Sequence, residues 1–592
     1  MLGRCAGAAL FTVAVCMAQS PSSLPETAAG PATTPEHIAD PVPLEERAVP
    51  VTAPGPGEAG VPIALSLDSA LLTAIANNRS IEIGRVELDV NRTYVPEARA
   101  AFDPLLLGSV SAGRSKEQRA STTDERSSKL SLLSRISGSS VTSGSGSSGQ
   151  NTTPLLDAYQ RALSLGQEDL NDINAIVAYL EQPEHPFTKT RDSDGFVTVQ
   201  NYLPTGTLVF LTVDMSHSDT NRAPDDYRGA WSLGVSQALL QGRGLDVNLV
   251  ELKQARNLVA QSEAEFRRLV LEISRLVEDT YWELVLAHEV LKIREFALTL
   301  ADEQLKRNED LYSVGKVVVG DVMSAKAERA SRTADLAGAR AGIRNQTLAL
   351  IRLLNPGAAG MWQLEFTPLD RPEANHVVID AEVSHQLAML YRPELDMSKL
   401  ELANRSLDVV RARNGLLPRL DLTASYGRTS RGTASGDASA FLDSSTFDNF
   451  RIGLNFETSI LYRGERARHR RARFLEDEAA LTIADVEQAV STQVRQAAVE
   501  VQQQWERISA TQEAVKSRLE ELRIAQDRNA VGKATNLDVQ IVQRNLIQAE
   551  VDEATARVRY SEALTALYAA EGTLLERRGI RLNLESDDGE QQ

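Results

Sequence analysis

The chain has little of what most large enzymes and nucleic-acid-binding proteins contain. Its 592 residues include only two cysteines, and aromatic residues make up 5%. The 63 lysines and arginines are outnumbered by 81 aspartates and glutamates. The resulting net charge of −18 argues against a general nucleic-acid binder, which needs clustered basic residues to neutralise phosphates. No run of about 18 or more apolar residues occurs, so no helical membrane span is expected.

Sequence motifs that carry enzyme chemistry are also missing. The seven histidines form no HExxH pair, and no set of cysteines and histidines has metal-ligand spacing. The two Gly-Lys pairs lack the earlier glycine of a phosphate-binding loop. Acidic residues are spread along predicted helices, where a solvated face is the usual reading. We therefore expect no enzyme, no cofactor and no metal site.

The first residues have the pattern of a secretory signal peptide. A basic residue precedes the apolar run Ala6–Met17, and small residues follow it, which predicts a signal peptide over 1–18. Cleavage there would remove both cysteines, Cys5 and Cys16, and leave a protein without disulfides. The alternative is that Cys16 is a lipid-anchored N-terminus, although the larger Val15 stands where a small residue is expected.

Two stretches without glycine or proline dominate the remaining sequence, Leu245–Val314 and Glu465–Val531. The absence of both helix breakers over such lengths predicts two continuous helices. At about 1.5 Å per residue, each would be roughly 100 Å long. Apolar residues recur at spacings of four and three in the first stretch, which is typical of a coiled coil. A further helix follows each stretch, over Asp321–Leu354 and Leu537–Ala570.

The second half of the chain repeats the first. Val314-Gly-Lys aligns with Val531-Gly-Lys, and the same shift places Asp321 on Asp538. The predicted order of elements in each half is a helix, a strand region, a very long helix, a tight turn and a further helix. The predicted organisation is a Pro-rich disordered linker at 19–64, a first repeat at 65–356, an inter-repeat linker at 357–379, a second repeat at 380–572 and an acidic flexible tail at 573–592.

Strands are expected between the helices of each repeat. In the last of them, Phe450, Ile452, Leu454 and Phe456 alternate with polar residues, which gives one apolar and one polar face. Two interpretations stay open at this point: a membrane barrel wall, or a half-buried strand of a soluble sheet. The expected strands are Leu105–Gly113, Trp231–Leu239, Leu420–Tyr426 and Phe450–Glu457. An insertion over about 114–196 interrupts the first repeat, and a further strand pair, Phe196–Tyr202 and Thr207–His217, accompanies it.

The two Val-Gly-Lys turns join the helices of each repeat. Glycine after a helix suits a left-handed C-cap, and Thr535, Asn536 or Asp538 can cap the helix that follows. The turns are either well-formed helical hairpins and nothing more, or docking tips at the ends of long struts.

Together these features resemble the TolC family of outer-membrane efflux proteins, over about 65–572. The segments that carry the resemblance are the opening helix at Leu67–Asn78, the entries to the strands at Ala98–Pro104 and Ala412–Pro418, the returns from them at Leu239–Gly244 and Ile460–Gly464, and the two Val-Gly-Lys turns. Each motif alone is weak, and the duplicated order with the helix lengths makes the combination specific.

The resemblance implies a mixed α/β membrane protein. Three protomers would each give four strands to one 12-stranded outer-membrane β-barrel, continued by a long α-helical coiled-coil periplasmic barrel. The strand pair over Phe196–His217 exceeds these four, and two interpretations stay open: it extends above the membrane, or it enlarges the barrel. The protein would be the exit duct of a tripartite efflux or type I secretion system in the cell outer membrane, in contact with outer-membrane lipid. Its partners would be a periplasmic adaptor (membrane fusion) protein and an inner-membrane RND or ABC transporter.

The resemblance also implies roles for residues at the turns. The adaptor-docking tips would be Gly315, Lys316, Gly320, Gly532, Lys533 and Thr535. Asp538, with Asp321 as its counterpart, would narrow the lumen. A ring of three such carboxylates favours cations and raises their pKa values by mutual repulsion. The chain departs from the family at three positions of the gate, where Ile541 replaces a second aspartate, Ala534 a basic residue and Asn529 a tyrosine.

The competing hypothesis is an exported periplasmic coiled-coil scaffold or adaptor without a membrane barrel. The alternating strands distinguish the two hypotheses, because a soluble scaffold has no reason to gather four large apolar side chains on one exposed face.

Overall fold

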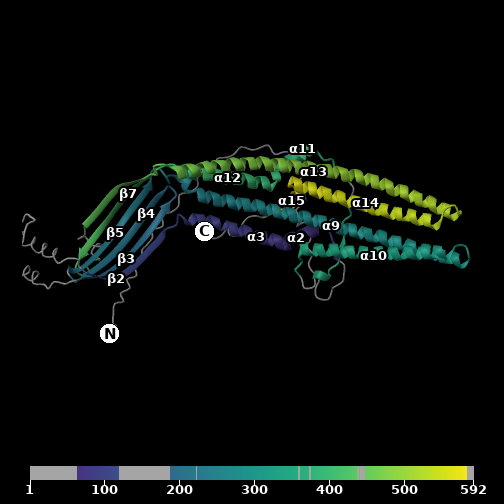
Figure 1. The fold of residues 1–592 in the computed structure, drawn as a ribbon, viewed down its shortest axis with the longest axis horizontal. Coiled ribbons are helices and arrows are strands. Elements are labelled where there is room, and N and C mark those ends of the chain that lie inside the picture. The colour runs from purple at the N-terminus through teal and green to yellow at the C-terminus, as the bar shows by residue number, and fades with distance from the viewer. Residues whose placement is uncertain are drawn as a thin grey trace, which may run out of the picture.

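The structure is a computed structural model, and it describes residues 63–118, 187–221, 223–357, 361–372, 375–436, 439 and 447–582. The predicted signal peptide, nearly all of the linker at 19–64, the middle of the insertion and the last ten residues of the tail lie outside these ranges. Figure 1 shows an elongated molecule with a sheet at one end and long helices running away from it. Within the described ranges, no helix has both the length and the hydropathy needed to cross a membrane.

Two very long helices form the body of the molecule, as predicted. α9 spans Val250–Ser313, after a single turn, α8, at Leu245–Asn248, and α13 spans Arg463–Ala530. At 64 and 68 residues, both are about 100 Å long. α10 (Val319–Leu354) folds back along α9, and α14 (Asn536–Glu571) folds back along α13. The result is two helical hairpins whose turns lie at the end farthest from the sheet (Figure 1).

Shorter helices precede the strands in each repeat and pack on the long ones. The first repeat has α2 (Leu67–Asn77), α3 (Arg79–Arg92) and α4 (Tyr94–Ala100), and the second has α11 (Ala381–Tyr391) and α12 (Pro393–Asn414). Caps fix their starts: Ser66, Asn78 and Asp380 accept hydrogen bonds from backbone N–H groups of α2, α3 and α11.

The largest core lies where α2 and α10 meet the middle of α9. Leu71 of α2, Tyr281 and Leu284 of α9 and Leu350 of α10 are fully buried there. A two-stranded parallel sheet of β1 (Ile63–Leu65) and β6 (Phe366–Pro368) borders this core. The expected inter-repeat linker at 357–379 thus contains β6 and a short 3₁₀ helix, Met361–Gln363.

The folded part of the chain extends past the predicted boundary at residue 572. A short helix, α15 (Leu574–Arg577), buries Leu574 and Leu575 in the core around α9. Arg578 then forms two hydrogen bonds of 2.7 Å with the fully buried carboxylate of Glu278. The prediction of a flexible tail from 573 is therefore wrong for 573–582, because two leucines and one arginine complete a core built by the first repeat.

The large sheet contains six antiparallel strands in the order β2-β3-β4-β5-β7-β8. They are β2 (Leu105–Gln118), β3 (Phe187–Leu203), β4 (Thr207–Thr220), β5 (Ala223–Ala238), β7 (Arg419–Gly432) and β8 (Phe447–Glu457). All of the predicted strands are present and most are longer than predicted. The predicted strand pair of the first repeat, β3 and β4, lies between β2 and β5, so the sheet has two strands more than the four that the family resemblance implies. The insertion is correspondingly shorter than 114–196, since residues 114–118 and 187–196 are strand.

The sheet has one apolar face and one polar face, because residues paired across strands lie on the same side. One row across all six strands consists of Leu106, Val199, Leu211, Leu233, Tyr426 and Phe450. The next row, on the opposite side, consists of Leu107, Thr198, Thr212, Ser232, Gly427 and Asn449. The apolar face is exposed in the protomer: Phe450 is 70% and Ile452 64% accessible.

Candidate functional site

The turns of the two helical hairpins have the same backbone geometry. Gly315 and Gly532 both have φ of +74°, the left-handed conformation that glycine adopts without steric cost. The N–H of Lys316 donates to the carbonyl of Leu311 at 2.9 Å, and the N–H of Lys533 donates to that of Arg528 at 2.8 Å. Both are the long-range bond of a Schellman C-cap, so the predicted caps are confirmed. We call these turns, residues 314–321 and 531–538, the first tip and the second tip.

The helices that leave the two tips start differently. At the second tip, Thr535 is the N-cap of α14 and forms a capping box with Asp538. At the first tip the N-cap is Val318, which provides no side-chain hydrogen bond. Gly320 is the second residue of α10 and is helical, so it is part of the helix start rather than of the turn.

The capping box lowers the pKa of Asp538. Its Oδ2 accepts a hydrogen bond of 2.8 Å from the backbone N–H of Thr535 and one of 2.7 Å from the Thr535 hydroxyl. Both bonds favour the carboxylate and hold its pKa below the ordinary range. They act within one protomer. The repulsion expected in a ring of three carboxylates acts between protomers, and it stays a prediction.

Both tips expose apolar side chains. Val314, Val318 and Val319 at the first tip are between 53% and 69% accessible, and Val531 and Leu537 at the second are 67% and 58% accessible. Lys316 and Lys533 are exposed beside them. Exposed apolar residues gathered at the end of a long helical hairpin are typical of a protein-docking surface.

Four side-chain amides connect the two tips, and sequence reasoning missed them as a group. We call Gln304, Asn308, Asn529 and Asn536 the amide cluster. Gln304 donates to Asn308 at 3.2 Å, and Asn536 donates to the Oδ1 of Asn308 at 3.4 Å. Asn529 donates to Asn536 at 3.3 Å and to the carbonyl of Ala534 at 3.0 Å. The departure from the family at Asn529 therefore has a structural role here, as a link between the two hairpins.

A signal for this cluster exists in the sequence. Ala297, Ala301, Gln304 and Asn308 are buried and follow one another at spacings of four, three and four. They continue the heptad seam of α9 with amides in place of apolar residues. Asn308 is fully buried and also donates to the backbone carbonyl of Asp321 at 3.3 Å. Polar contacts between α10 and α14 add to the link, from Ser324 to Gln540 and from Arg544 to Glu328.

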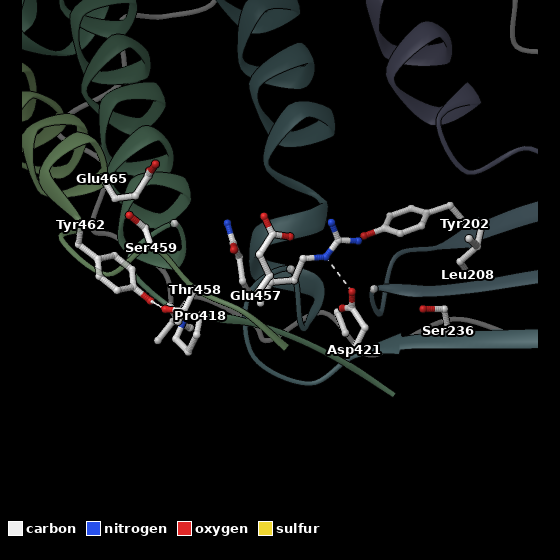
Figure 2. A pocket seen from close by; sticks show the side chains of 17 residues that line it. Tyr202, Leu208, Ser236, Pro418, Asp421, Glu457, Thr458, Ser459, Tyr462 and Glu465 are labelled. Carbon is white, nitrogen blue, oxygen red and sulfur yellow. Dashed lines mark hydrogen bonds and ion pairs between the residues drawn. The ribbon is translucent and has the colours of Figure 1, made fainter. Parts of the chain in front are cut away.

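A pocket of about 580 Å³ opens at the other end of the helices, where the sheet meets α13. Figure 2 shows its side chains, with Tyr202 on the strand side, Tyr462 on the helix side and Asp421 between them. Asp421 accepts a hydrogen bond of 2.7 Å from Arg419. Ser236, Asp421 and Glu457 belong to the polar face, so the pocket opens on that side of the sheet. Nothing in its lining pairs a nucleophile with a base.

Metal coordination finds no support in the part of the chain that the structure describes. Within it, no group of three or more histidines, cysteines, aspartates and glutamates is arranged to hold a metal ion. The structure instead brings together surfaces: the two tips at one end, and an apolar sheet face at the other.

Comparison with known proteins shows which proteins the chain is similar to. Residues 385–573 match the family described as "Outer membrane efflux protein". The chain is 25% identical over 312 residues to outer membrane protein TolC of Escherichia coli, a match that covers 51% of this chain and 62% of TolC. It is 24% identical over 366 residues to outer membrane efflux protein BepC of Brucella suis, covering 59% and 74%. The match to TolC thus spans less than two thirds of that relative.

Similarity in fold covers more of the chain than similarity in sequence does. The CmeC outer membrane channel of Campylobacter jejuni superposes with a TM-score of 0.56 at 17% identity, over 86% of each chain. The family match lies in the second repeat, and the fold match includes both repeats. Residues 385–573 therefore match the outer membrane efflux protein family, and the chain shares the fold of an outer membrane channel over most of its length.

Proposed function

We propose that the protein is the outer-membrane exit duct of a tripartite efflux or type I secretion system. It functions as a homotrimer, with its sheet in the cell outer membrane and its helices in the periplasm. The observation that carries this proposal is the division of the whole sheet into an exposed apolar face and a polar face. A wall between lipid and a water-filled lumen needs that division along every strand.

Assembly into a trimer follows from the edges of the sheet. β2 and β8 are the two edge strands, and each presents unpaired backbone groups on one side. Pairing of β8 of one protomer with β2 of the next would close the sheet and satisfy these groups. Lipid would then cover the apolar face, which includes Phe450, Ile452 and Leu454, and the polar face would line the lumen.

The two tips are the proposed docking surface for a periplasmic adaptor, which connects the duct to an inner-membrane RND or ABC transporter. Gly315, Lys316, Gly532, Lys533 and Thr535 form the two turns, and Gly320 lies at the start of α10. The exposed valines beside the turns support the proposal, since apolar contact can hold a partner without any chemical reaction. Substrates pass through unchanged.

The lumen is narrowest, in this proposal, at a ring formed by Asp538 with Asp321 beside it. The amide cluster holds the two hairpins of each protomer together just above this ring, and its release would let the tips separate. Neutral amides make this link insensitive to pH and to salt, unlike an ion pair.

Cell fractionation and conductance together test the proposal. We expect heat-modifiable trimers in the outer membrane that form cation-selective channels in planar bilayers. Asp538→Asn should lower the cation selectivity. Thr535→Ala is the matched control, because it removes the cap that Asp538 supports and leaves the charge in place. Recovery of the protein in the soluble periplasmic fraction would support the scaffold hypothesis instead.

A further inference from the structure

We propose that every protomer contributes six membrane-spanning strands, so that the barrel has 18 strands, six from each of three copies. The proposal rests on the trimeric membrane duct proposed above and changes its size. The resemblance to the family implies four strands per protomer, and the extra two are β3 and β4.

The β3–β4 hairpin is an integral part of the sheet. β3 pairs with β2 over the full length of β2, from Leu105 opposite Gln200 to Gln118 opposite Phe187. β4 pairs with β5 without interruption from Thr207 to Ser218. The register shifts only between Ser218 and Thr220, at the end of the sheet away from the helices, which we call the outer end. A hairpin that projected above the membrane would leave β2 and β5 to pair with each other, and here it separates them along their length.

The hairpin also has the two faces that a membrane strand requires. Its side chains on the apolar face of the sheet include Val197, Val199, Val209, Leu211, Val213 and Met215, with Asn201 at the end nearest the helices. Those on the other face include the polar residues Gln200, Thr198, Thr212 and Asp214, and the hydroxyls of Thr198 and Thr212 form a hydrogen bond of 2.9 Å. Three apolar side chains lie among them on that face, Phe196, Leu208 and Phe210. The apolar residues continue the rows formed by Leu106 on β2 and by Leu233 on β5. Such rows of exposed apolar side chains would be unfavourable in water, and contact with lipid would account for them.

The turn of the hairpin fixes its height relative to the other strands. Asn248, in the single turn that precedes α9, donates to the carbonyls of Pro204 and Gly242 at 3.1 and 2.8 Å. Its Oδ1 accepts a hydrogen bond of 3.1 Å from the hydroxyl of Tyr202. Gly206 has φ of +85°, and a Cβ there would lie 2.3 Å from the carbonyl oxygen of Gly242. The turn is therefore held at the junction with the helices, level with the ends of β2 and β5.

The added strands widen the barrel without widening the helical tunnel. Barrel diameter grows roughly linearly with strand number, so 18 strands give about 1.5 times the diameter of 12. The hairpin enters and leaves the sheet at its outer end, and no helix lies between β2 and β5 among the residues that the structure describes. The barrel would therefore be wider than a 12-stranded one on the same helices, and the tips would still set the size limit for substrates.

Adjacent cysteine substitutions test the position of the hairpin. Trimers purified with Thr212→Cys or Val213→Cys are placed in lipid nanodiscs and treated with a charged maleimide, with the wild-type protein as the baseline. We expect labelling at position 212, in the lumen, and loss of labelling at position 213, in lipid. Arg451→Cys and Ile452→Cys form the matched pair on β8, where the same difference is expected.

The two pairs of cysteine substitutions distinguish a failure of the 18-stranded barrel from a failure of the membrane duct. Labelling at both 212 and 213, with Ile452→Cys protected, would place the hairpin outside the membrane and overturn the 18-stranded barrel while the duct stands. Labelling of Ile452→Cys would contradict the membrane duct itself.

A deletion measures the width directly. Both ends of the hairpin lie at the outer end of the sheet, so removal of 187–220 leaves β2 and β5 free to pair. Electron microscopy of the trimers should show a barrel diameter reduced to about two thirds of the full-length value. Equal diameters would overturn the proposal.

Discussion

The two repeats share one order of elements and differ in how many strands they hold. Among the residues that the structure describes, the first repeat gives four strands to the large sheet, β2 to β5, and the second gives two, β7 and β8. Their long helices nevertheless differ by only four residues, 64 against 68. A hairpin of strands can be added to such a sheet without altering the helices, because both ends of the hairpin lie at the outer end of the sheet, away from the helices.

The tips differ in a second way. Both have the same glycine turn, but only the second has a side-chain cap, formed by Thr535 and Asp538. The first has Val318 in place of Thr535, although Asp321 stands in place of Asp538, and Val318 is exposed. The second tip is therefore built for local stability, and the first offers the larger apolar surface for docking.

The cores differ in size as well. The core of the first repeat, around Tyr281 and Leu284, is completed by residues from the C-terminal end of the chain, Leu574 and Leu575. The second repeat has smaller clusters, one of them around Val501 and Tyr560. The end of the second repeat thus stabilises the first.

The largest expected effect comes from breaking that connection. Arg578→Ala leaves the buried carboxylate of Glu278 without its charged partner, which should lower the free energy of unfolding by about 3 kcal/mol. Thermal unfolding followed by circular dichroism measures the loss. Arg581→Ala, at an exposed position, is the control and should change stability little. Equal destabilisation by both variants would contradict the role assigned to the ion pair.

A smaller effect is expected at the amide cluster. Asn308→Ala removes the buried oxygen to which the amides of Gln304 and Asn536 both donate, at a local cost of about 1–3 kcal/mol. Because the cluster connects the hairpins, amide hydrogen exchange should become faster at both tips. Lys306→Ala, exposed on the same helix, should leave the exchange unchanged. Faster exchange at the first tip alone would mean that the tips are independent.

The smallest effects on stability are expected at the N-cap positions of α14 and α10, where two substitutions test whether the cap accounts for the difference between the tips. Thr535→Ala should destabilise the start of α14 by about 1 kcal/mol, and Val318→Thr should stabilise the start of α10 by a similar amount. Hydrogen exchange of the first turns of α10 and α14 measures both. Opposite signs support the capping account, and a loss of stability at both tips would contradict it.

Acid should reduce the difference in local stability between the start of α14 and the start of α10. The folded-state pKa of Asp538 is lowered, so its stabilising effect is complete above the ordinary aspartate pKa of about 3.9 and is lost as pH falls through the lower folded value. Exchange at the start of α14, corrected for the intrinsic rate at each pH, should therefore rise at acid pH more than exchange at the start of α10. An equal rise at both would contradict the assignment.

Sequence reasoning could predict the parts of the fold that local signals determine. The absence of glycine and proline predicted both long helices, and glycine after each of them predicted the turns at Gly315 and Gly532. Alternation predicted the last strand, around Phe450, and the pair that includes Phe196 and Thr207 was expected on either side of a turn. It could not show that this pair joins the sheet, because alternation does not specify the neighbours of a strand.

Features that depend on contacts between distant segments could not be predicted in the same way. The amide cluster requires Asn308 and Asn536, 228 positions apart, to lie side by side. The folding of 573–582 requires a core built by α9, and the short sequence around Leu574 has too few residues to indicate a helix by periodicity.

One measurement tests the central claim most directly: electron cryo-microscopy of the protein purified from outer membranes and placed in lipid nanodiscs. We predict three copies around an open axis, with the sheet inside the lipid disc and the helices projecting from it as one tube. A particle without threefold symmetry, or one whose sheet lies outside the disc, would contradict the account.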